Sequence, residues 1–361
     1  MPPEDIDPHA ARIALTVSCR DCEAVPKVEN AGRILVENGQ SVQIMHNGVR
    51  VAAGGYHGAW MAEIIARLRG HHEPQEEAVF DAVMRHVPLQ ATMLELGGFW
   101  SYYSLWFLSG APESRRAIVL EPDPAHIAIG ERNARLNDTK TIKFLQGFVG
   151  PTPIPEQRFP SESSGEITAR CYSVPEILSS RGIDHLDVLH CDTQGAETGV
   201  IGSCEALFRN HQIGFGFFST HAHQISGDPL THQRCLQMLR DFGGQILAEH
   251  DVHESYSGDG LIAAYFGKDA LAWQDVKLSV NRYSHGIFPN PLYDLSEAQR
   301  VLQGQTATIA ELQRERNALI LELERERARL RVASPRAEVP SAASPRRSVL
   351  DKLLSRVSGK R

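Results

Sequence analysis

The fold of this chain is decided by residues 92–109, which read TMLELGGFWSYYSLWFLS. A short apolar run ends in two glycines, and a segment of helical length follows them. A backbone that turns sharply from a strand into a helix, and that lets a ligand approach closely, requires glycine. The stretch therefore predicts a strand at Thr92–Leu96, a helix at Ser101–Ser109 and a binding loop between them.

Short apolar runs alternate with amphipathic stretches onward from this segment. Further strands are predicted at Ala117–Leu120, Ile142–Phe148, Asp187–Cys191, Ile213–Ser219, Gln245–Glu254 and Leu261–Phe266, and further helices at Ala125–Asn137, Val174–Arg181, Glu197–Asn210 and Leu230–Phe242. Strands that alternate with helices form a mostly parallel sheet covered on both faces, so the fold class is α/β. A turn-rich loop at 255–260 joins the last two strands and predicts an antiparallel terminal pair.

The segment before this alternation predicts a small appendage. Asn38-Gly39 and Asn47-Gly48 are each flanked by short alternating segments, and Asn-Gly supplies the positive φ angles of a tight hairpin turn. Residues 33–51 are therefore predicted to form an antiparallel meander. Two helices are predicted to follow, at Ala59–Arg69 and Glu73–His86.

The C-terminal region carries a heptad pattern. Apolar residues recur at Leu295, Leu302, Ile309, Leu323 and Leu330, with Leu312 and Leu319 in the second seam position. Arg316 and Glu326 also fall on the seam. The pattern predicts a helix or a coiled coil at 295–332, through which the chain could form a homo-oligomer.

Residues 333–361 are rich in Ser, Pro and Ala and carry seven basic against two acidic residues. This composition predicts a disordered basic tail with a short amphipathic helix at its end. Such a helix could contact an anionic membrane surface or an acidic partner. A solvated tail that makes no such contact is an equal alternative.

Composition narrows the class of protein. The 361 residues are 42% hydrophobic and 22% charged, as in a globular soluble protein, and the net charge of −7 argues against a body that binds nucleic acid. The acidic N-terminus does not resemble a signal peptide, and the long uncharged run Leu96–Pro112 is too short and too polar to span a bilayer. Six scattered cysteines do not form a disulfide framework. We therefore expect a cytoplasmic protein.

Acidic residues follow two of the predicted strands. Glu121 lies some twenty residues after the two glycines, at a strand end where a carboxylate can accept both hydroxyls of a ribose. Asp192 follows the strand at 187–191, at the carboxyl edge where open α/β sheets keep their active sites. Glu197 begins the next helix. It could belong to the same site, or it could only supply a favourable negative charge to the first helical turn.

Three motifs in order resemble the FkbM-type methyltransferases. They are LELGGFWSYYSLWF at 94–107, VLEPDPAHIAIGERNARLN at 119–137 and DVLHCDTQGAETGVIGS at 187–203. The resemblance covers roughly residues 73–267. It implies a Rossmann-like, seven-stranded methyltransferase sheet with an antiparallel terminal strand, and S-adenosyl-L-methionine as cofactor. By the same resemblance, Glu95, Gly97 and Gly98 line the methionine end of the cofactor, Glu121 and Asp192 belong to its binding site, with Glu121 holding the ribose, and Gln146 lies near the adenine.

The chain departs from the family pattern at two places. The family usually has Asp-Val-Gly-Ala-Asn-Ile-Gly in the first motif, whereas Phe99-Trp100-Ser101 occupy the last three places here. The two aromatic residues narrow the entrance to the cofactor site, and Ser101, counted among the cofactor-site residues, is expected to cap the following helix with its hydroxyl. Many members also carry a glutamate after the fifth strand, where this chain has the segment 218–223, FSTHAH.

That second departure supplies the candidate catalytic residues. An alcohol is a poor nucleophile while protonated, so a general base or a metal is expected. His221 and His223 alternate on a predicted extended segment and so share one side, near Asp192. We predict that one of the histidines is the base and that Asp192 orients it or binds the acceptor hydroxyl. A divalent metal held by these three residues is the less favoured alternative, and either histidine taken singly could only hydrogen-bond to a loop.

Other polar groups have simpler explanations. Cys19 and Cys22 form a CxxC pair, but a zinc site would need His9, His46 or His57 to converge on it, so unligated cysteines are the default. His71-His72 before Glu73 are interpreted as exposed residues at a helix start. The loops at 226–232 and 257–260 are candidates for the rim of an acceptor pocket.

The sequence thus predicts an S-adenosylmethionine-dependent O-methyltransferase whose acceptor is a hydroxyl of a sugar, a glycan or a secondary metabolite. One alternative is a catalytically silent methyltransferase fold that serves as an interaction module, and another is a protein or lipid acceptor reached through the basic tail. The predicted organisation is an N-terminal meander and helix appendage at 1–72, an FkbM-like domain at 73–270, a connecting segment at 271–294, a coiled-coil helix at 295–332 and the basic tail at 333–361.

Overall fold

The computed structural model describes residues 8–161, 163–274, 276–281 and 291–333. The chain divides into two compact units, Met1–Gln299 and Arg300–Arg361. The predicted appendage, α/β domain and connecting segment all fall in the first unit. The predicted basic tail lies outside the described residues from position 334 onward.

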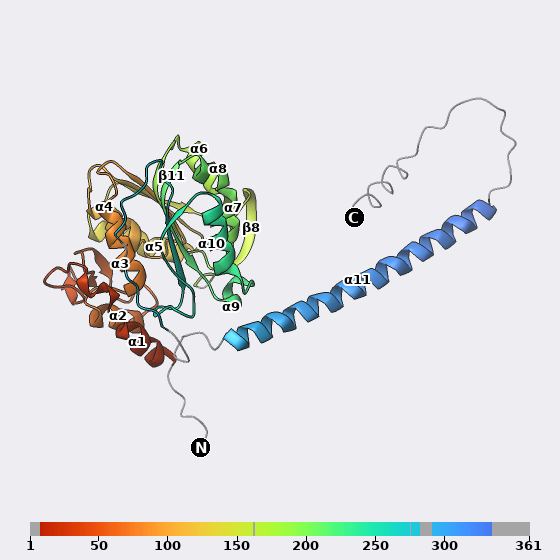
Figure 1. Cartoon of the computed structure of the whole chain (residues 1–361). Helices are drawn as coiled ribbons and strands as arrows, with labels where there is room; N and C mark the ends of the chain where they lie inside the picture. The colour runs from red at the N-terminus through yellow and green to blue at the C-terminus, as the bar shows by residue number, and fades with distance from the viewer. Residues whose placement is uncertain (1–7, 162, 275, 282–290, 334–361) are drawn as a thin grey trace, which may run out of the picture. The chain divides into compact units, whose positions relative to one another are not determined.

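A seven-stranded sheet forms the centre of the first unit (Figure 1). Its strands are β4 (Thr92–Leu96), β5 (Arg116–Glu121), β6 (Ile142–Gln146), β10 (Leu186–Cys191), β11 (Ile213–Thr220), β12 (Gln245–His250) and β13 (Gly260–Tyr265). Their order is β12-β13-β11-β10-β4-β5-β6. Only β13 runs antiparallel to its neighbours, β11 and β12. The predicted mostly parallel sheet with an antiparallel last strand is confirmed, and that strand lies between two others rather than at the edge.

Helices cover both faces of the sheet, which explains why its strands read as continuous apolar runs. One face packs against α3 (Pro74–Met84), α4 (Tyr102–Ser109) and α5 (Pro124–Leu136), and the other against α6 (Val174–Ser180), α7 (Glu197–Ser203), α8 (Glu205–Arg209) and α10 (Thr231–Asp241). Along β4, Met93 enters the first core and Leu94 the second. The carboxyl ends of the parallel strands are therefore left as the open edge on which a site can form.

The predicted strand at Ile142–Phe148 is two strands in the structure. It breaks at Gly147, after which β7 (Phe148–Val149) leaves the main sheet and pairs with β9 (Gly165–Tyr172). Strand β8 (Ile154–Ser161) pairs antiparallel with β9, and the three form a separate sheet. The sequence pattern does not predict this hairpin because Pro155 and Pro160 lower strand propensity, although Ser164-Gly165 is a turn signal.

The predicted meander is confirmed as β1 (Ile34–Glu37), β2 (Gln40–Ile44) and β3 (Arg50–Ala52). It is docked on α5 by side-chain amides, since Asn133 and Asn137 accept hydrogen bonds from the backbone N–H groups of Ala52 and Arg50 at 2.8 and 2.9 Å. Helix α2 (Ala59–Arg67) follows as predicted. Helix α1 (Pro8–Ser18), the short 3-10 helix at Asp21–Ala24 and the short α9 (His223–Ser226) were not predicted.

The connecting segment also belongs to this unit. Trp273 donates its indole N–H to the carbonyl of Leu247 at 3.0 Å, and Ser279 bonds to the carboxylate of Asp21. Through Trp273 and Ser279, this segment therefore links the sheet to the N-terminal region.

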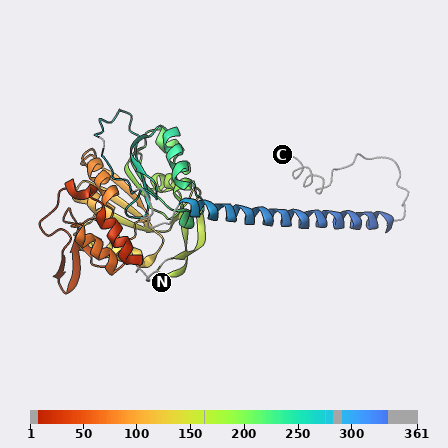
Figure 2. The ribbon, with the colours of Figure 1, turned by 60° about the horizontal axis from the view of Figure 1, so that its bottom comes forward.

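Helix α11 (Pro291–Ala333) is continuous (Figure 2), so the predicted C-terminal helix is confirmed. Its described side chains from 299 to 329 are all exposed. Among the described residues, no helix is both long and apolar enough to cross a membrane. All six cysteines are free, in agreement with the absence of a disulfide framework.

Gly70 offers a test of how the appendage is held. It has φ +94°, and a Cβ atom there would lie 2.2 Å from the backbone nitrogen of His46. We expect Gly70→Ala to lower the free energy of unfolding by at least about 3 kcal/mol, since overpacking adds to a left-handed backbone. Gly39 is the matched control: it has φ +76° but no atom within 4 Å of the added Cβ, so Gly39→Ala should cost about 1 kcal/mol. Equal losses in chemical denaturation would contradict the packing described.

Candidate functional site

Two pockets adjoin each other at the carboxyl edge of the sheet. The main pocket, of about 510 Å³, is lined by the ends of β4, β5 and β10 and by the β8–β9 hairpin. The adjoining pocket, of about 460 Å³, lies between α1, α2 and the loop after β12. Both are lined by Glu73 and Asp192, so the two spaces meet at these carboxylates.

The glycine turn of the first motif forms part of the main pocket. Gly97 has φ +75°, and a Cβ atom there would lie 1.7 Å from the carbonyl oxygen of Asp192. A Cβ on Gly98 would lie 2.2 Å from Val119. Both glycines are thus required by the close approach of neighbouring strands, and this approach brings Asp192 beside the turn.

Aromatic residues of the same motif line the main pocket without closing it. Phe99 stacks on His126, and Trp100 stacks on Tyr56 with ring centroids 4.6 Å apart. The expected helix cap by Ser101 is wrong: the residue is left-handed at φ 63°, and its hydroxyl makes no cap hydrogen bond. Its side chain is buried against Gly130 of α5 and lines neither pocket.

Glu121 lies in the main pocket and is held by its neighbours. One carboxylate oxygen accepts from the N–H of Phe99 at 3.0 Å, and the other from the N–H of Asp123 at 2.9 Å and from His126 at 3.2 Å. A carboxylate has about four acceptor positions, so one remains for a ligand hydroxyl. Gln146 lies outside the pocket, exposed at the end of β6, and its amide donates to the carbonyl of Pro122; its neighbour Gly147 lines the pocket instead.

The β8–β9 hairpin forms one wall of the main pocket, through Phe159 and other residues. Its tip is fastened to Asp123, whose carboxylate accepts from the hydroxyls of Ser161 and Ser164 while also capping α5. Burial opposes the charge of Asp123, but these hydrogen bonds outweigh it and lower the pKa to about 2. The hairpin is therefore held over the pocket by an ionised carboxylate.

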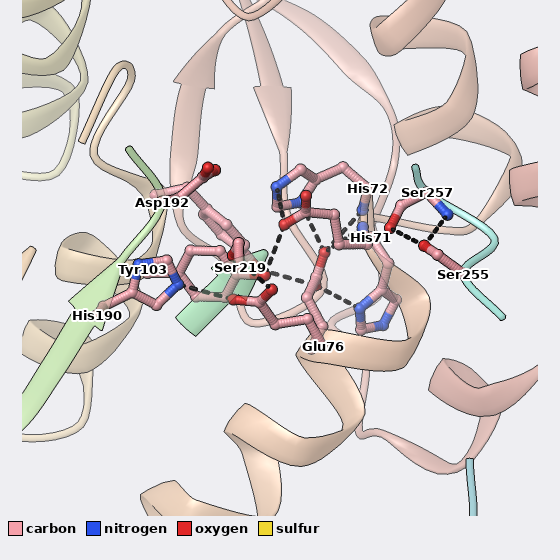
Figure 3. Close-up of polar contacts among 12 residues, drawn as sticks. His71, His72, Glu76, Tyr103, His190, Asp192, Ser219, Ser255 and Ser257 are labelled. Atoms are coloured by element: carbon pink, nitrogen blue, oxygen red, sulfur yellow. Dashed lines mark hydrogen bonds and ion pairs between the residues drawn. The ribbon is translucent and has the colours of Figure 1, made fainter. Parts of the chain in front are cut away.

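Figure 3 shows a cluster of polar side chains, several of which line the main pocket. Glu95 and His190 are neighbours on β4 and β10, and His190 donates to Glu76 at 2.7 Å while its ring stacks on Tyr103. Burial raises the pKa of Glu95 to about 7. For His190 burial opposes the charge, but the hydrogen bond to Glu76 raises its pKa above the usual value.

His72 is the second cation of the region. Its two ring nitrogens face Glu77 at 2.7 Å and Glu73 at 3.2 Å. Burial lowers the pKa of His72, yet the two carboxylates raise it to about 10 overall. Tyr103 donates to Glu73 at 2.9 Å, so Glu73 is oriented where the pockets meet.

His221 is surrounded by carboxylates. Its Nδ1 lies 3.1 Å from Glu197, and its Nε2 lies 3.2 Å from Asp192 and 3.7 Å from Asp259. Burial opposes the charge, but the carboxylates of Asp259, Asp192 and Glu197 hold the pKa of His221 well above its usual range. Burial raises the pKa of Asp259 to about 7, and the nearby imidazolium opposes this rise.

The structure separates His221 from His223. Strand β11 ends at Thr220, and His223 is the first residue of α9, so the predicted alternation on an extended segment is wrong. A helical turn begins there because the N–H groups of Ile225 and Ser226 both bond to the carbonyl of Ala222. His223 lines neither pocket.

Glu197 does more than place a charge in a helical turn. It is fully buried, and it accepts hydrogen bonds from Thr193 and from the N–H of Gly195 as well as from His221. Burial opposes its charge, but the bonds from His221 and Gly195 lower its pKa. Glu197 thus fixes both the loop after Asp192 and the ring of His221.

The predicted rim loops contribute in different ways. Ser226 lines the main pocket, and Ser257 and Asp259 line the adjoining one. Asp228 is a turn residue: it accepts from the N–H of Leu230 and pairs with Arg234 at 2.7 Å. Helix α1, which the sequence analysis missed, supplies Arg12 to the adjoining pocket.

Among the described residues, one group has the spacing of metal ligands: His46, His71 and Glu77, all buried. The rings of His46 and His71 are stacked 4.2 Å apart with planes only 12° from parallel, so their lone pairs do not converge on one ion. Glu77 is occupied by His71 at 2.6 Å and His72 at 2.7 Å. The cluster is better explained as a buried carboxylate in hydrogen-bond contact with His71 and His72. The interpretation of His71 and His72 as exposed residues is wrong.

The CxxC pair does not take part in this group. Cys19 and Cys22 are buried, and burial raises the pKa of each thiol to about 12. Because a thiolate rather than a thiol is the metal ligand, these cysteines fit the apolar core.

Comparison with known proteins yields one family match. Residues 85–246 match the model described as the methyltransferase FkbM domain. No curated protein matches the chain.

Solved structures similar to this chain share little sequence with it. A methyltransferase FkbM from Methylobacillus flagellatus is 17% identical, with 49% of this chain and 44% of that chain covered and a TM-score of 0.37. A putative O-methyltransferase from Klebsiella pneumoniae is 15% identical, with 52% and 78% covered and a TM-score of 0.34. A fibrillarin from Aeropyrum pernix in complex with S-adenosyl-L-methionine is 16% identical, with 68% and 86% covered and a TM-score of 0.34.

The match to the Methylobacillus protein thus spans less than half of that protein's length. The seven-stranded sheet, the glycine turn at the end of β4 and the acidic residue at the end of β5 agree with the family match. Residues 85–246 form an FkbM-type domain of the S-adenosylmethionine-dependent methyltransferases.

Proposed function

We propose that this protein is an O-methyltransferase that transfers a methyl group from S-adenosyl-L-methionine to a hydroxyl of a sugar, a glycan or a secondary metabolite. The observation that carries the proposal is the junction of two pockets at Asp192. One pocket has the features of a nucleoside site, and the other is lined by polar groups suited to a hydroxyl-rich acceptor.

The residues of the main pocket fit the cofactor. Its volume lies within the range of small-molecule sites. Glu121 has an acceptor position left for a ribose hydroxyl, and Glu95 and Asp192 in the same pocket suit the cationic methionine end. Bound there, S-adenosyl-L-methionine would supply an electrophilic methyl group on a sulfonium centre.

The adjoining pocket fits a polyhydroxylated acceptor. Arg12, Glu73 and Asp259 present charged donors and acceptors, and Tyr56 adds an aromatic face. Arg12 is held in place, since it donates to the carbonyl of Ser257 at 2.9 Å and lies over the ring of Trp60. Donors, acceptors and an aromatic face together match the hydroxyls and the C–H surface of a sugar ring.

We assign the role of general base to Asp259 rather than to a histidine. Both nitrogens of His221 face carboxylates, so the ring is an imidazolium at neutral pH and has no free lone pair. Asp259 has a pKa near the working pH, where a general base is most effective. Asp192, where the pockets meet, holds the acceptor hydroxyl, and Asp259 takes its proton.

The cofactor site can be tested by titration calorimetry with S-adenosylhomocysteine. We expect Glu121→Ala to weaken binding by at least about tenfold, because a buried hydrogen bond to a charged group is lost. Glu131→Ala, on the exposed side of α5, is the control and should bind as the wild type does. Equal affinities in the two variants would contradict the pocket assignment, and absence of binding to folded wild-type protein would favour the catalytically silent interaction module.

The base assignment can be tested with a panel of nucleotide sugars and free monosaccharides, by following S-adenosylhomocysteine release. With the acceptor that turns over, we expect Asp259→Asn to lower kcat by about 10²- to 10⁴-fold, the usual contribution of a general base. Binding of S-adenosylhomocysteine should persist. Asp241→Asn, at the end of α10, is the control. If Asp259→Asn keeps full kcat, the assignment is wrong.

The pH dependence of kcat/KM follows from the pKa values of Asp259 and His221. Because the raised pKa of Asp259 keeps it protonated below about pH 7, kcat/KM should rise with pH up to about 7 and then level off. The raised pKa of His221 should keep its ring charged throughout this range, which NMR of the imidazole, assigned with His221→Gln, can check. A His221 that loses its proton between pH 6 and 8 would show that a neutral histidine is available as the base.

A further inference from the structure

Helix α11 presents an apolar stripe that nothing covers among the described residues. Leu302, Ile309, Leu312, Leu319 and Leu323 are each more than half exposed. Their spacings of seven, three, seven and four residues place all five at the a and d positions of one heptad repeat, the pattern of a coiled-coil seam. A long helix with such a stripe is stable in water when a second helix covers it.

We propose that the part of the stripe from Ile309 onward binds the same segment of a second copy of this chain, and that the two helices run antiparallel about a two-fold axis at residue 321. In this register Leu319 faces Leu323 of the second copy, and Leu323 faces Leu319. Leu312 faces position 330, which is also a leucine in the sequence. Apolar layers therefore meet apolar layers on both sides of the axis.

The charges on the seam select the orientation. Arg316 and Glu326 occupy seam positions and are exposed in the structure. In a parallel pair in register, Arg316 would face Arg316 and Glu326 would face Glu326, which places like charges together in the seam. In the antiparallel pair Arg316 faces Glu326 of the second copy, twice over, so each seam charge meets its opposite.

The same charges select the register. Moving the antiparallel pair by one heptad in either direction would set Glu326 against an apolar residue, Ile309 in one case and Leu323 in the other. A charge that faces an apolar side chain loses hydration without gaining a partner. The register centred on residue 321 avoids this loss.

Flanking residues support the arrangement. In this register Glu315 lies across from Arg329 of the second copy, and Ile320 lies beside Ile320 near the axis. One contact is unfavourable, because Glu322 lies beside Glu322 at the axis. In a parallel pair Glu322 would instead lie near Arg327 of the partner, so this residue distinguishes the two orientations.

The oligomeric state of the full chain is the first measurement, by light scattering after size exclusion over a range of concentrations. We expect a dimer. Arg316→Glu and Glu326→Arg should each weaken it by about tenfold or more, because each sets like charges opposite each other in two layers. The double variant R316E/E326R should restore the wild-type affinity. A wild-type chain that stays monomeric would overturn the proposal and leave the stripe to a different partner.

Two further variants test the orientation. Glu322→Gln should tighten the antiparallel dimer roughly two- to fivefold by removing a repulsion, whereas it would weaken a parallel one. For cross-linking, a chain with Arg316→Cys should form no disulfide with itself, because the two Cα atoms would be about 15 Å apart along the axis. Mixed with a chain carrying Glu326→Cys, it should form one.

The native cysteines are buried, so we expect little cross-linking through them. The wild-type chain, treated in the same way, measures this background. Self-cross-linking of Arg316→Cys, or a weaker dimer with Glu322→Gln, would overturn the antiparallel arrangement. Far-ultraviolet circular dichroism of each variant excludes loss of the helix as the cause of a change.

Discussion

The site depends on a balance of buried charge at the carboxyl edge of the sheet. Glu73, Asp192 and Asp259 line the adjoining pocket, and in a low dielectric they would repel one another unless cations lay between them. His72 and His221 supply that charge, each with its two ring nitrogens against carboxylates. The raised pKa values of both histidines keep them charged, so they offset the charge of the neighbouring carboxylates. This balance also explains how a pocket with several acidic groups can remain folded at neutral pH.

Segments outside the matched domain complete this site. The family match ends at residue 246, yet Asp259 comes from the loop before β13, and Arg12 and Tyr56 come from the N-terminal region. The meander is fastened to α5, and Trp273 and Ser279 join the sheet to the N-terminal region. The matched domain thus supplies most of the main pocket, whereas the N-terminal segments supply much of the adjoining pocket. Under the proposed function, the choice of acceptor would depend on residues outside the matched domain.

A second use of charge concerns α11. Its seam contains one basic and one acidic residue ten positions apart, and such a pair is unfavourable in one helix orientation and favourable in the other. The pairing of opposite charges therefore matters both in the site and along α11. In the site, opposite charges hold side chains in place within one molecule, and along α11 they choose the direction and register of a second molecule.

The parallel sheet, the meander, the long helix, the glycine turn and the placement of Glu121 and Asp192 follow from sequence patterns alone. Strand and helix periods and glycine turns are local properties of the chain. The same patterns do not determine the β8–β9 hairpin, whose prolines hide its strands, or the split of the strand at Gly147. Three features of the site appear only in the folded structure. Ser101 makes no cap, His223 lies in α9 while carboxylates surround His221, and Asp259 lies near Asp192 although it is 67 residues further along the chain. Each of these depends on which distant carboxylate or backbone group lies nearby, and packing rather than local spacing sets that distance.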